Sequence, residues 1–282
     1  MTGEFTAADE PVAPRAADVS FLRDADLRAR AYFVKFGSTE QSYVDLDDPT
    51  HLEFEYVQRI AESIDIGFPD GDRLRAVHIG GGGLTLPRYL AHTRPTSAQL
   101  VLEPDVGLTQ LVRERLPLPR ASGIKVRGVD GRTGLAAIRD DYADLIVLDA
   151  FAGARVPAEL TTVEFLADCR RVLDAGGLLL INVTDLRPLD YTRRLVAGVR
   201  RHFPFVVLSA EPSTLKGRRF GNLVVQAGDR EPDLLGLERA AARAAFPFRL
   251  LHDASLDRFV GAATPFTDAD SAMSPPPPGG PF

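Results

Sequence analysis

Short apolar runs that alternate with helical segments constrain the fold of this 282-residue chain more than any other feature. Runs such as Leu178–Val183 (LLLINV) are apolar on both faces, which predicts strands that are covered on both sides. Strands of this kind separated by helices predict a doubly wound α/β fold with a mostly parallel sheet. Because the last two strands follow one another directly, we expect the last one to be antiparallel. The seven predicted strands are Arg75–Ile79, Gln99–Glu103, Ile124–Val129, Asp144–Leu148, Leu178–Val183, Phe205–Ser209 and Leu223–Gln226.

Shifts in composition divide the chain into four parts. Residues 1–20 mix proline, alanine and acids without periodicity, and residues 264–282 form a Pro/Gly-rich stretch with four consecutive prolines, so we expect both ends to be loose tails. Residues 21–67 contain two strand-like runs around Gly37, which predict a small N-terminal β-hairpin region. Residues 68–263 form the predicted Rossmann-like nucleoside-binding catalytic domain. The predicted helices are Leu52–Ile64, Leu84–Thr93, Val106–Leu116, Arg132–Asp140, Leu160–Leu173 and Leu189–Phe203.

The charge and cysteine content exclude several classes of partner. A net charge of −6 gives no general attraction to nucleic-acid phosphates. No apolar run approaches the ~20 residues that a membrane-spanning helix needs, and no signal-peptide pattern is present. We therefore expect no nucleic-acid or membrane partner and a cytoplasmic location. The single cysteine, Cys169, cannot build a cysteine-based zinc site, and the histidines lack metal-ligand spacing, so no metal is expected.

Four consecutive glycines, Gly80–Gly83, follow the first predicted strand and precede a helix. Glycine lets a ligand lie against the backbone of such a turn, although the spacing is neither G-x-G-x-x-G nor a Walker motif. Glu103, about twenty residues on, ends the next strand, where a carboxylate can accept both ribose hydroxyls. A flexible turn and a solvated acid are the alternatives, and Asp105 is a possible substitute for Glu103.

Two more acids end the following strands. Asp130, followed by Gly131, can accept from the exocyclic amine of adenine, or it can cap the helix that comes next. Asp149 ends the run LIVLDAF, whose apolar surroundings can raise its pKa into the range of a general base; a helix cap or a structural acid is the alternative. The stretch Phe151–Ala158 contains glycine and proline between strand and helix, and we expect it to act as a mobile lid.

Eight short motifs, taken in order, resemble a known family. They are Gln41-Ser42-Tyr43, Glu53-Phe54-Glu55-Tyr56, Ile79-Gly80-Gly81-Gly82, Glu103, Asp130-Gly131, Leu148-Asp149, Pro157-Ala158-Glu159 and Glu164-Phe165. Over roughly residues 41–226 this series resembles the spermidine synthase family of polyamine aminopropyltransferases. The resemblance implies a sheet of the S-adenosylmethionine-dependent methyltransferase type. It also implies decarboxylated S-adenosylmethionine as a co-substrate rather than a tightly bound cofactor, a small-molecule amine as acceptor, and a possible homodimer.

The resemblance also implies roles for individual residues. Asp149 matches the acid that takes part in deprotonating the attacking amine, and Tyr56 matches a tyrosine that helps it. Glu103 would hold the ribose of the co-substrate and Asp130 its adenine amine. The full set of residues implied to bind the co-substrate is Gln41, Gly80, Gly81, Gly82, Glu103, Asp130, Gly131 and Pro157.

The sequence departs from the family pattern mainly in the amine half of the site. Gly83 and Ala152 stand where the family has aspartates, Val57-Gln58 replaces a His-Glu pair, and a second tyrosine expected near residue 215 is not evident. Losing carboxylates weakens the attraction for a polyamine. Two alternatives to aminopropyl transfer therefore stay open. One is a methyltransferase that uses S-adenosylmethionine itself, and the other is a non-catalytic nucleoside-binding homologue. The acceptor is not defined by the sequence.

Overall fold

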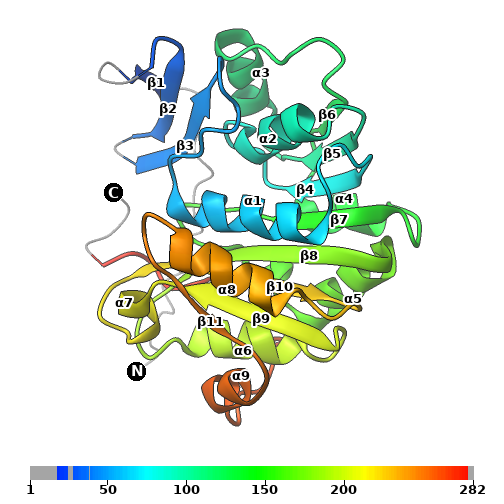
Figure 1. The fold of residues 1–282 in the computed structure, drawn as a ribbon, viewed down its shortest axis with the longest axis vertical. Coiled ribbons are helices and arrows are strands. Elements are labelled where there is room, and N and C mark those ends of the chain that lie inside the picture. The colour runs from blue at the N-terminus through cyan, green and yellow to red at the C-terminus, as the bar shows by residue number, and fades with distance from the viewer. Residues whose placement is uncertain (1–17, 25–27, 38, 279–282) are drawn as a thin grey trace, which may run out of the picture.

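A computed structural model describes residues 18–24, 28–37 and 39–278. Its large sheet consists of β4 (Arg75–Ile79), β5 (Ala98–Leu102), β6 (Ile124–Arg127), β7 (Ala143–Leu148), β8 (Leu173–Asp185), β9 (Phe205–Ala210), β10 (Gly221–Gly228) and β11 (Arg249–Leu251). The strand order is β11-β9-β10-β8-β7-β4-β5-β6 (Figure 1). The five neighbouring strands β8, β7, β4, β5 and β6 pair in parallel. The pairs β10–β8, β10–β9 and β11–β9 are antiparallel.

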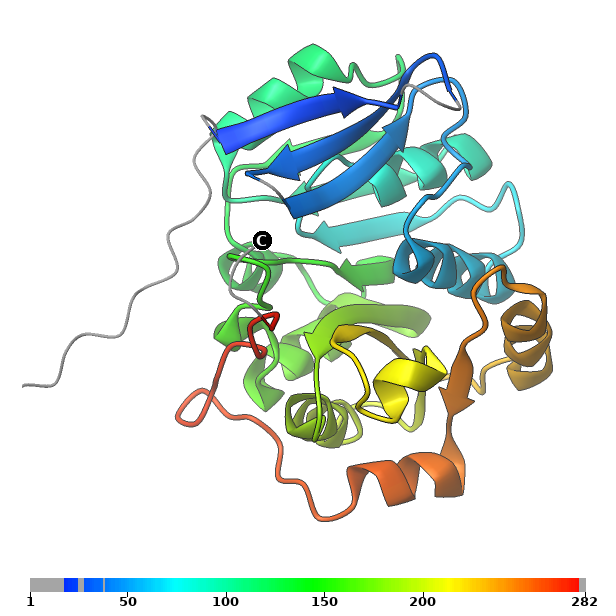
Figure 2. The same cartoon turned by 90° about the vertical axis from the view of Figure 1, so that its left-hand side faces the viewer.

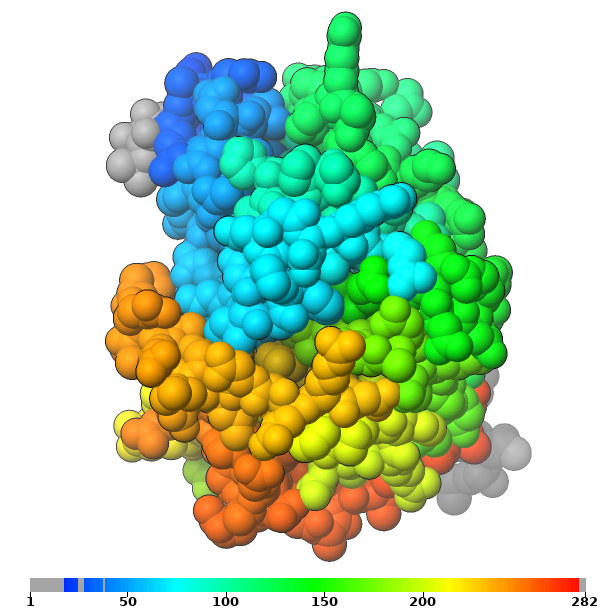
Figure 3. All heavy atoms as spheres, turned by 45° about the vertical axis from the view of Figure 1, so that its right-hand side comes forward, coloured from blue at the N-terminus to red at the C-terminus, as the bar shows by residue number. Residues whose placement is uncertain are grey.

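Helices cover both faces of this sheet, as the apolar runs predict. Along β7, Leu145 and Val147 join the core under the first two helices, whereas Ile146 and Leu148 join the core on the opposite face. One face is covered by α1 (Glu55–Gly67), α2 (Thr85–Thr93) and α3 (Val106–Arg115), and the other by α4 (Gly131–Ala136), α5 (Val163–Val172), α6 (Asp190–Val199) and α9 (Asp253–Val260). The α8 helix (Leu234–Arg243) lies against α1 (Figure 3), and α7 (Pro212–Leu215) follows β9.

The doubly wound α/β prediction is confirmed, including the antiparallel orientation of the last predicted strand, which is β10. The count of seven strands was one short, because the three-residue β11 is too brief to carry a periodic pattern. The predicted helix from Leu160 begins as a 3-10 turn, Ala158–Leu160, and becomes α5 only at Val163. No helix in the described part of the chain is long and apolar enough to cross a bilayer.

A second, smaller sheet lies beside the glycine loop (Figure 2). It contains β1 (Val19–Arg23), β2 (Ala31–Phe36) and β3 (Thr39–Asp45), all antiparallel in the order β1-β2-β3. The predicted hairpin is therefore present as β2 and β3, but β1 was missed. The tail expected for residues 1–20 is wrong from Val19 onward, where β1 begins, and residues 1–17 lie outside the described residues.

The C-terminal stretch also differs from the expected loose tail. As far as residue 278 it packs back onto the large domain, with Phe266 and Ser274 fully buried. The Val163 N–H donates to the Phe266 carbonyl (2.9 Å), and the Val156 N–H donates to Ser274 Oγ (2.8 Å). Prolines prevent this stretch from joining a helix or the sheet, but its other residues supply buried anchors that no local pattern reveals.

Candidate active site

A cavity of about 1440 Å³ lies at the carboxyl ends of the parallel strands, between the two sheets. The strand order places the residues that follow β6, β5, β4 and β7, and Thr184 near the end of β8, in one row along this edge. All ten residues that the sequence singled out line this cavity: Gln41, Tyr56, Gly80, Gly81, Gly82, Glu103, Asp130, Gly131, Asp149 and Pro157. The structure thus brings the predicted site residues together, while their individual roles stay predictions.

The backbone around position 80, at the end of β4 and beside the end of β7, requires a glycine there. Gly80 has φ +95°, and a Cβ there would lie 2.2 Å from the carbonyl oxygen of Asp149. Only glycine fits at such a position. Its N–H donates to the Leu102 carbonyl (2.9 Å), which holds the loop against β5. A substitution at Gly80 would therefore push directly on the backbone that carries Asp149.

Glu103 braces the glycine loop from the neighbouring strand end. Its carboxylate accepts hydrogen bonds from the N–H groups of Gly81 (2.8 Å) and Asp105 (2.9 Å). Burial raises the pKa of Glu103, although these N–H donors oppose the shift. Asp105, the possible substitute for Glu103, instead caps α3 by accepting from the Leu108 N–H (2.8 Å).

Asp130 has the capping role that the sequence left open. Its side chain is the N-cap of α4 and accepts from the Thr133 N–H (2.8 Å). Because Asp130 is also exposed to the cavity, capping and contact with a ligand are compatible. Gly131 is required by packing, since a Cβ there would lie 2.3 Å from Ile79 Cγ2.

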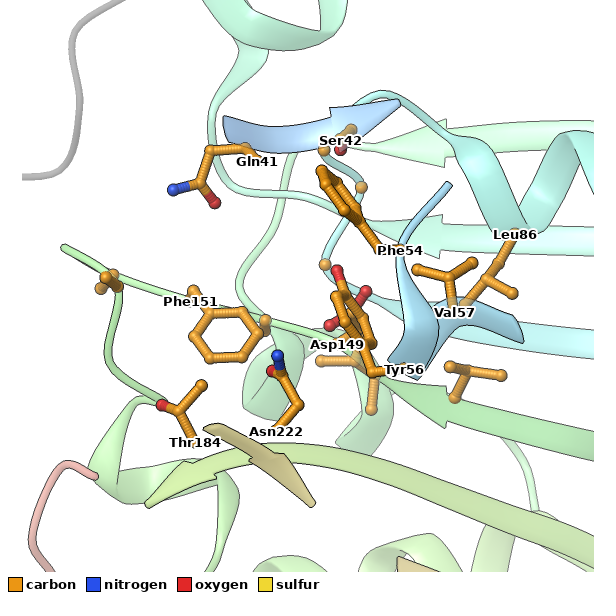
Figure 4. A pocket seen from close by; sticks show the side chains of 18 of the residues that line it. Gln41, Ser42, Phe54, Tyr56, Val57, Leu86, Asp149, Phe151, Thr184 and Asn222 are labelled. Carbon is orange, nitrogen blue, oxygen red and sulfur yellow. The ribbon is translucent and has the colours of Figure 1, made fainter. Parts of the chain in front are cut away.

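Asp149 follows β7 in this row, between the glycine loop after β4 and Thr184 of β8, and the Tyr56 side chain reaches it from α1 (Figure 4). Burial raises the pKa of Asp149 to about 6, although hydrogen bonds from Asn182 Nδ2 (2.9 Å) and from Tyr56 oppose the shift. Burial and the Asp149 charge together raise the pKa of Tyr56, which keeps its hydroxyl a proton donor. A carboxylate with a pKa near neutrality is suited to act as a general base. Sequence reasoning did not identify Asn182 as part of the site.

Gly83 stands where the family has an aspartate, and the small sheet explains the difference. The Gly83 N–H donates to Ser42 Oγ (2.9 Å). A Cβ at Gly83 would lie 2.8 Å from Ser42 Cβ and 3.0 Å from Val44 Cγ2. With β3 in this place, no larger residue fits at position 83 unless the strand moves.

The part of the cavity beyond Asp149 contains charged residues that sequence reasoning missed. Glu55, in the first turn of α1, and Glu211, directly after β9, form a hydrogen-bonded pair of carboxyl groups. Burial and the neighbouring Glu211 raise the pKa of Glu55 to about 7. Arg219 Nη2 donates to Glu211 Oε1 (2.9 Å), and Arg59 donates to the Asn222 carbonyl (3.3 Å). The only indication of this pair in the sequence was that Glu55 precedes Tyr56 in the family-like motif Glu53-Phe54-Glu55-Tyr56.

Acids outnumber bases among the described residues that line the cavity. The bases are Arg59 and Arg219, and His78 is kept neutral because burial lowers its pKa to about 4. The arrangement therefore favours cationic ligands. Within the described ranges no group of three or more potential ligands is placed to hold a metal ion. The acidic lining residues are Glu40, Glu53, Glu55, Glu103, Asp105, Asp130, Asp149, Glu159 and Glu211.

The chain is similar in sequence to proteins named polyamine aminopropyltransferase. The chain is 25% identical over 240 residues to the polyamine aminopropyltransferase of Chromobacterium violaceum, covering 83% of this chain and 85% of the relative. It is 27% identical over 169 residues to the enzyme of that name from Vibrio vulnificus, covering 58% of this chain and only 55% of the relative's length. No family model matches the chain.

Solved structures point in the same direction. The crystal structure of a probable spermidine synthase from Corynebacterium glutamicum is 31% identical, with a TM-score of 0.83, and the similarity covers 92% of this chain and 95% of that one. Spermidine synthase from Thermotoga maritima is 16% identical with a TM-score of 0.56, over 89% of this chain and 78% of that one, and shows the same fold. The chain therefore belongs to the spermidine synthase family of polyamine aminopropyltransferases, as a divergent member.

Proposed function

We propose that the protein transfers an aminopropyl group from decarboxylated S-adenosylmethionine to a small-molecule amine. The observation that carries this proposal is the position of Asp149, a buried carboxylate with a pKa of about 6 that lines a cavity rich in acids, between the glycine loop and Thr184. Both proposed reactants are cations, a sulfonium and an ammonium, and a cavity of this charge attracts them.

In the proposed reaction, the residues supply a base and a fixed alignment of the reactants. Asp149 removes the proton from the acceptor ammonium, whose pKa is ~10 in water, and Tyr56 keeps the carboxylate in place. The free amine then attacks the carbon next to sulfur. The N–C bond forms, the C–S bond breaks, and its electron pair goes to sulfur, giving neutral methylthioadenosine. The sulfonium is a strong leaving group and needs no acid, so positioning contributes much of the rate.

The row of strand ends divides the cavity between the two reactants. The residues proposed to bind the nucleoside, from Gly80 to Asp130, follow β4, β5 and β6. The opposite side, beyond Asp149, belongs to β8, β9 and β10 and is proposed to receive the acceptor. There Glu55 and Glu211 supply carboxyl groups that partly replace the family acid absent at Ala152.

The distribution of arginines favours the decarboxylated donor over S-adenosylmethionine. A methyl donor carries a free carboxylate, which a site usually pairs with a cation or with N–H donors. The two lining arginines are both in the acceptor half, where Arg219 is paired with Glu211 and Arg59 binds the Asn222 carbonyl. Nothing basic among the described lining residues faces the glycine loop.

The decisive experiment measures methylthioadenosine release by chromatography from decarboxylated S-adenosylmethionine and a panel of amines. We expect release together with an aminopropylated product, and its loss in Asp149→Asn. Formation of S-adenosylhomocysteine from S-adenosylmethionine and an acceptor would favour the methyltransferase alternative. Calorimetry that shows nucleoside binding without turnover of any amine would favour the non-catalytic one. A cytoplasmic location and a homodimer stay predictions, and light scattering tests the second.

A further inference from the structure

The described part of the C-terminal tail, residues 264–278, is named the C-terminal strap here (Figure 2), and its residues Met273 and Pro277 line the cavity. Two arginines hold the first half of the strap. Arg194 lies over the Phe266 ring, 4.0 Å from its centroid, and donates to the Thr264 carbonyl (3.0 Å). Arg132 forms an ion pair with Asp268 (2.5 Å). These contacts at residues 264–268 direct the later part of the strap, which contains Met273 and Pro277, to the cavity.

At the site, the strap pairs with the loop between β7 and α5. The Val156 N–H donates to Ser274 Oγ (2.8 Å), and the Ser274 N–H donates back to the Val156 carbonyl (3.2 Å). Arg155 donates to the Ser274 carbonyl through Nε (2.5 Å) and to the Met273 carbonyl (3.4 Å). This loop is the Phe151–Ala158 stretch that we expected to be a mobile lid, and its movement stays a prediction.

The strap lies on the acceptor side of the cavity. Ser274 Oγ is 3.3 Å from Thr184 Oγ1 near the end of β8. The β8 strand neighbours β7 on the side away from β4 and β5, so Thr184 and Asp149 stand between the strap and Glu103. Met273 and Pro277 of the strap line the cavity together with Ala152 and Ala154.

These four residues present apolar side chains to the cavity and are called the apolar wall here; one of them, Ala152, stands where the family pattern has a carboxylate. A charged nitrogen placed against such a wall would lose its hydration without gaining a partner. A hydrocarbon segment would instead gain from contact with the flexible methionine side chain. The wall is therefore suited to the apolar part of an acceptor whose reacting nitrogen lies at Asp149.

We propose that Met273 is a specificity-determining residue for the acceptor amine, and that Ser274 is a positioning residue that holds the Phe151–Ala158 loop in place. The proposal rests on the proposed function in that it takes the amine to be the molecule beyond Asp149. It assigns the strap to substrate recognition, with the acceptor presenting uncharged hydrocarbon to Met273.

The test compares Met273→Ala, Ser274→Ala and Ser274→Thr with the wild type, and uses Ala272→Ser as a matched control at an exposed neighbour in the strap. Initial rates are measured with linear monoamines and diamines of increasing length and with branched amines. We expect Met273→Ala to raise KM for the preferred acceptor about tenfold, because the acceptor's hydrocarbon loses its contact with the half-buried methionine side chain, and to shift preference toward bulkier amines. The donor KM should stay within about twofold, since the nucleoside lies on the other side of Asp149.

Ser274→Ala should raise the acceptor KM and lower kcat, because it leaves the buried Val156 N–H without an acceptor. Ser274→Thr keeps the hydroxyl and should restore both constants, a rescue that a purely steric role for Ser274 would not give. Thermal unfolding shows whether each variant is folded. If Ser274→Ala does not fold, Met273→Ala still tests the proposal.

A second measurement separates this proposal from the proposed function. Calorimetry follows amine binding to the methylthioadenosine complex of the wild type and of Met273→Ala, with no turnover required. Amine affinity that changes in Met273→Ala supports the proposal even if the wild type releases no methylthioadenosine, in which case the proposed function fails alone. Turnover with unchanged acceptor KM, preference and affinity in Met273→Ala overturns the proposal and leaves the function standing. A wild type that binds no amine overturns both.

Discussion

Replacing Asn182 with alanine should move the acid limb of the rate profile to higher pH. In the structure, Asn182 Nδ2 donates to Asp149 Oδ1 at 2.9 Å, and this bond lowers the pKa of a carboxylate that burial has raised to about 6. A donor to a charged acceptor stabilises the ionised form, so its removal must raise the pKa further.

The size of the shift follows from the strength of the bond. A hydrogen bond to a charged group contributes about 1.5–3 kcal/mol, and one pKa unit corresponds to about 1.4 kcal/mol, so the pKa should rise by about 1–2 units. At pH 7 the ionised fraction of Asp149 would fall from roughly nine tenths to between roughly one half and one tenth. Activity at pH 7 should fall by about two- to tenfold and should recover near pH 9.

The assay is the pH dependence of kcat/KM for methylthioadenosine release between pH 5 and pH 9.5. Asn222→Ala is the matched control, because Asn222 also lines the cavity but comes from β10 and is paired in register with Thr184. Folding is checked by thermal unfolding. The cost to stability should be modest, since Asn182 Oδ1 has no hydrogen-bond partner among the described residues. An acid limb that stays at the wild-type pH in folded Asn182→Ala would refute the assignment of Asp149 as the base.

Three further predictions concern the same row of strand ends. Asp149→Asn should abolish turnover, yet it should unfold at an equal or higher temperature than the wild type at pH 7. Because the folded-state pKa of Asp149 is raised, the wild type should gain stability relative to Asp149→Asn as the pH falls from about 6 toward 4. A difference in unfolding temperature between the two proteins that does not change with pH in calorimetry would contradict the raised pKa. Glu103→Ala should weaken nucleoside binding by about 1–3 kcal/mol, since it removes both a charged acceptor and the brace on the Gly81 N–H; titration calorimetry showing unchanged affinity would place the ribose elsewhere. Gly80→Ala should lower both stability and kcat, because its Cβ would collide with the Asp149 carbonyl; wild-type kcat would show that the loop can relax.

The strands of the large sheet were predictable because their burial is local in sequence. The run Leu145–Leu148 within β7 has to be apolar at every position because helices cover both faces of the sheet. Errors of one residue in the predicted strand ends nevertheless affected the description of the site. Glu103 was assigned to a strand, but β5 ends at Leu102, which leaves Glu103 free to turn and brace the glycine loop.

The acceptor half was not predictable because it is assembled from distant segments. Glu55 and Glu211 meet only after α1 packs beside β10, and neither carries a pattern that points to the other. The order of the C-terminal strap likewise depends on partners such as Val156, 118 positions away from Ser274. The β1 strand was missed because it is only five residues long, has no fully buried position and follows an acidic, proline-rich stretch.

The contact between Ser42 and Gly83 links the evolution of two regions that look independent in the sequence. The β3 strand occupies the volume that an aspartate side chain would need at position 83. In relatives that keep this backbone, an acid at position 83 should therefore co-occur with glycine at position 42 or with a displaced β3 strand. A single-site reversion toward the family motif would meet a steric barrier, so this lineage could recover the missing carboxylate only through paired change.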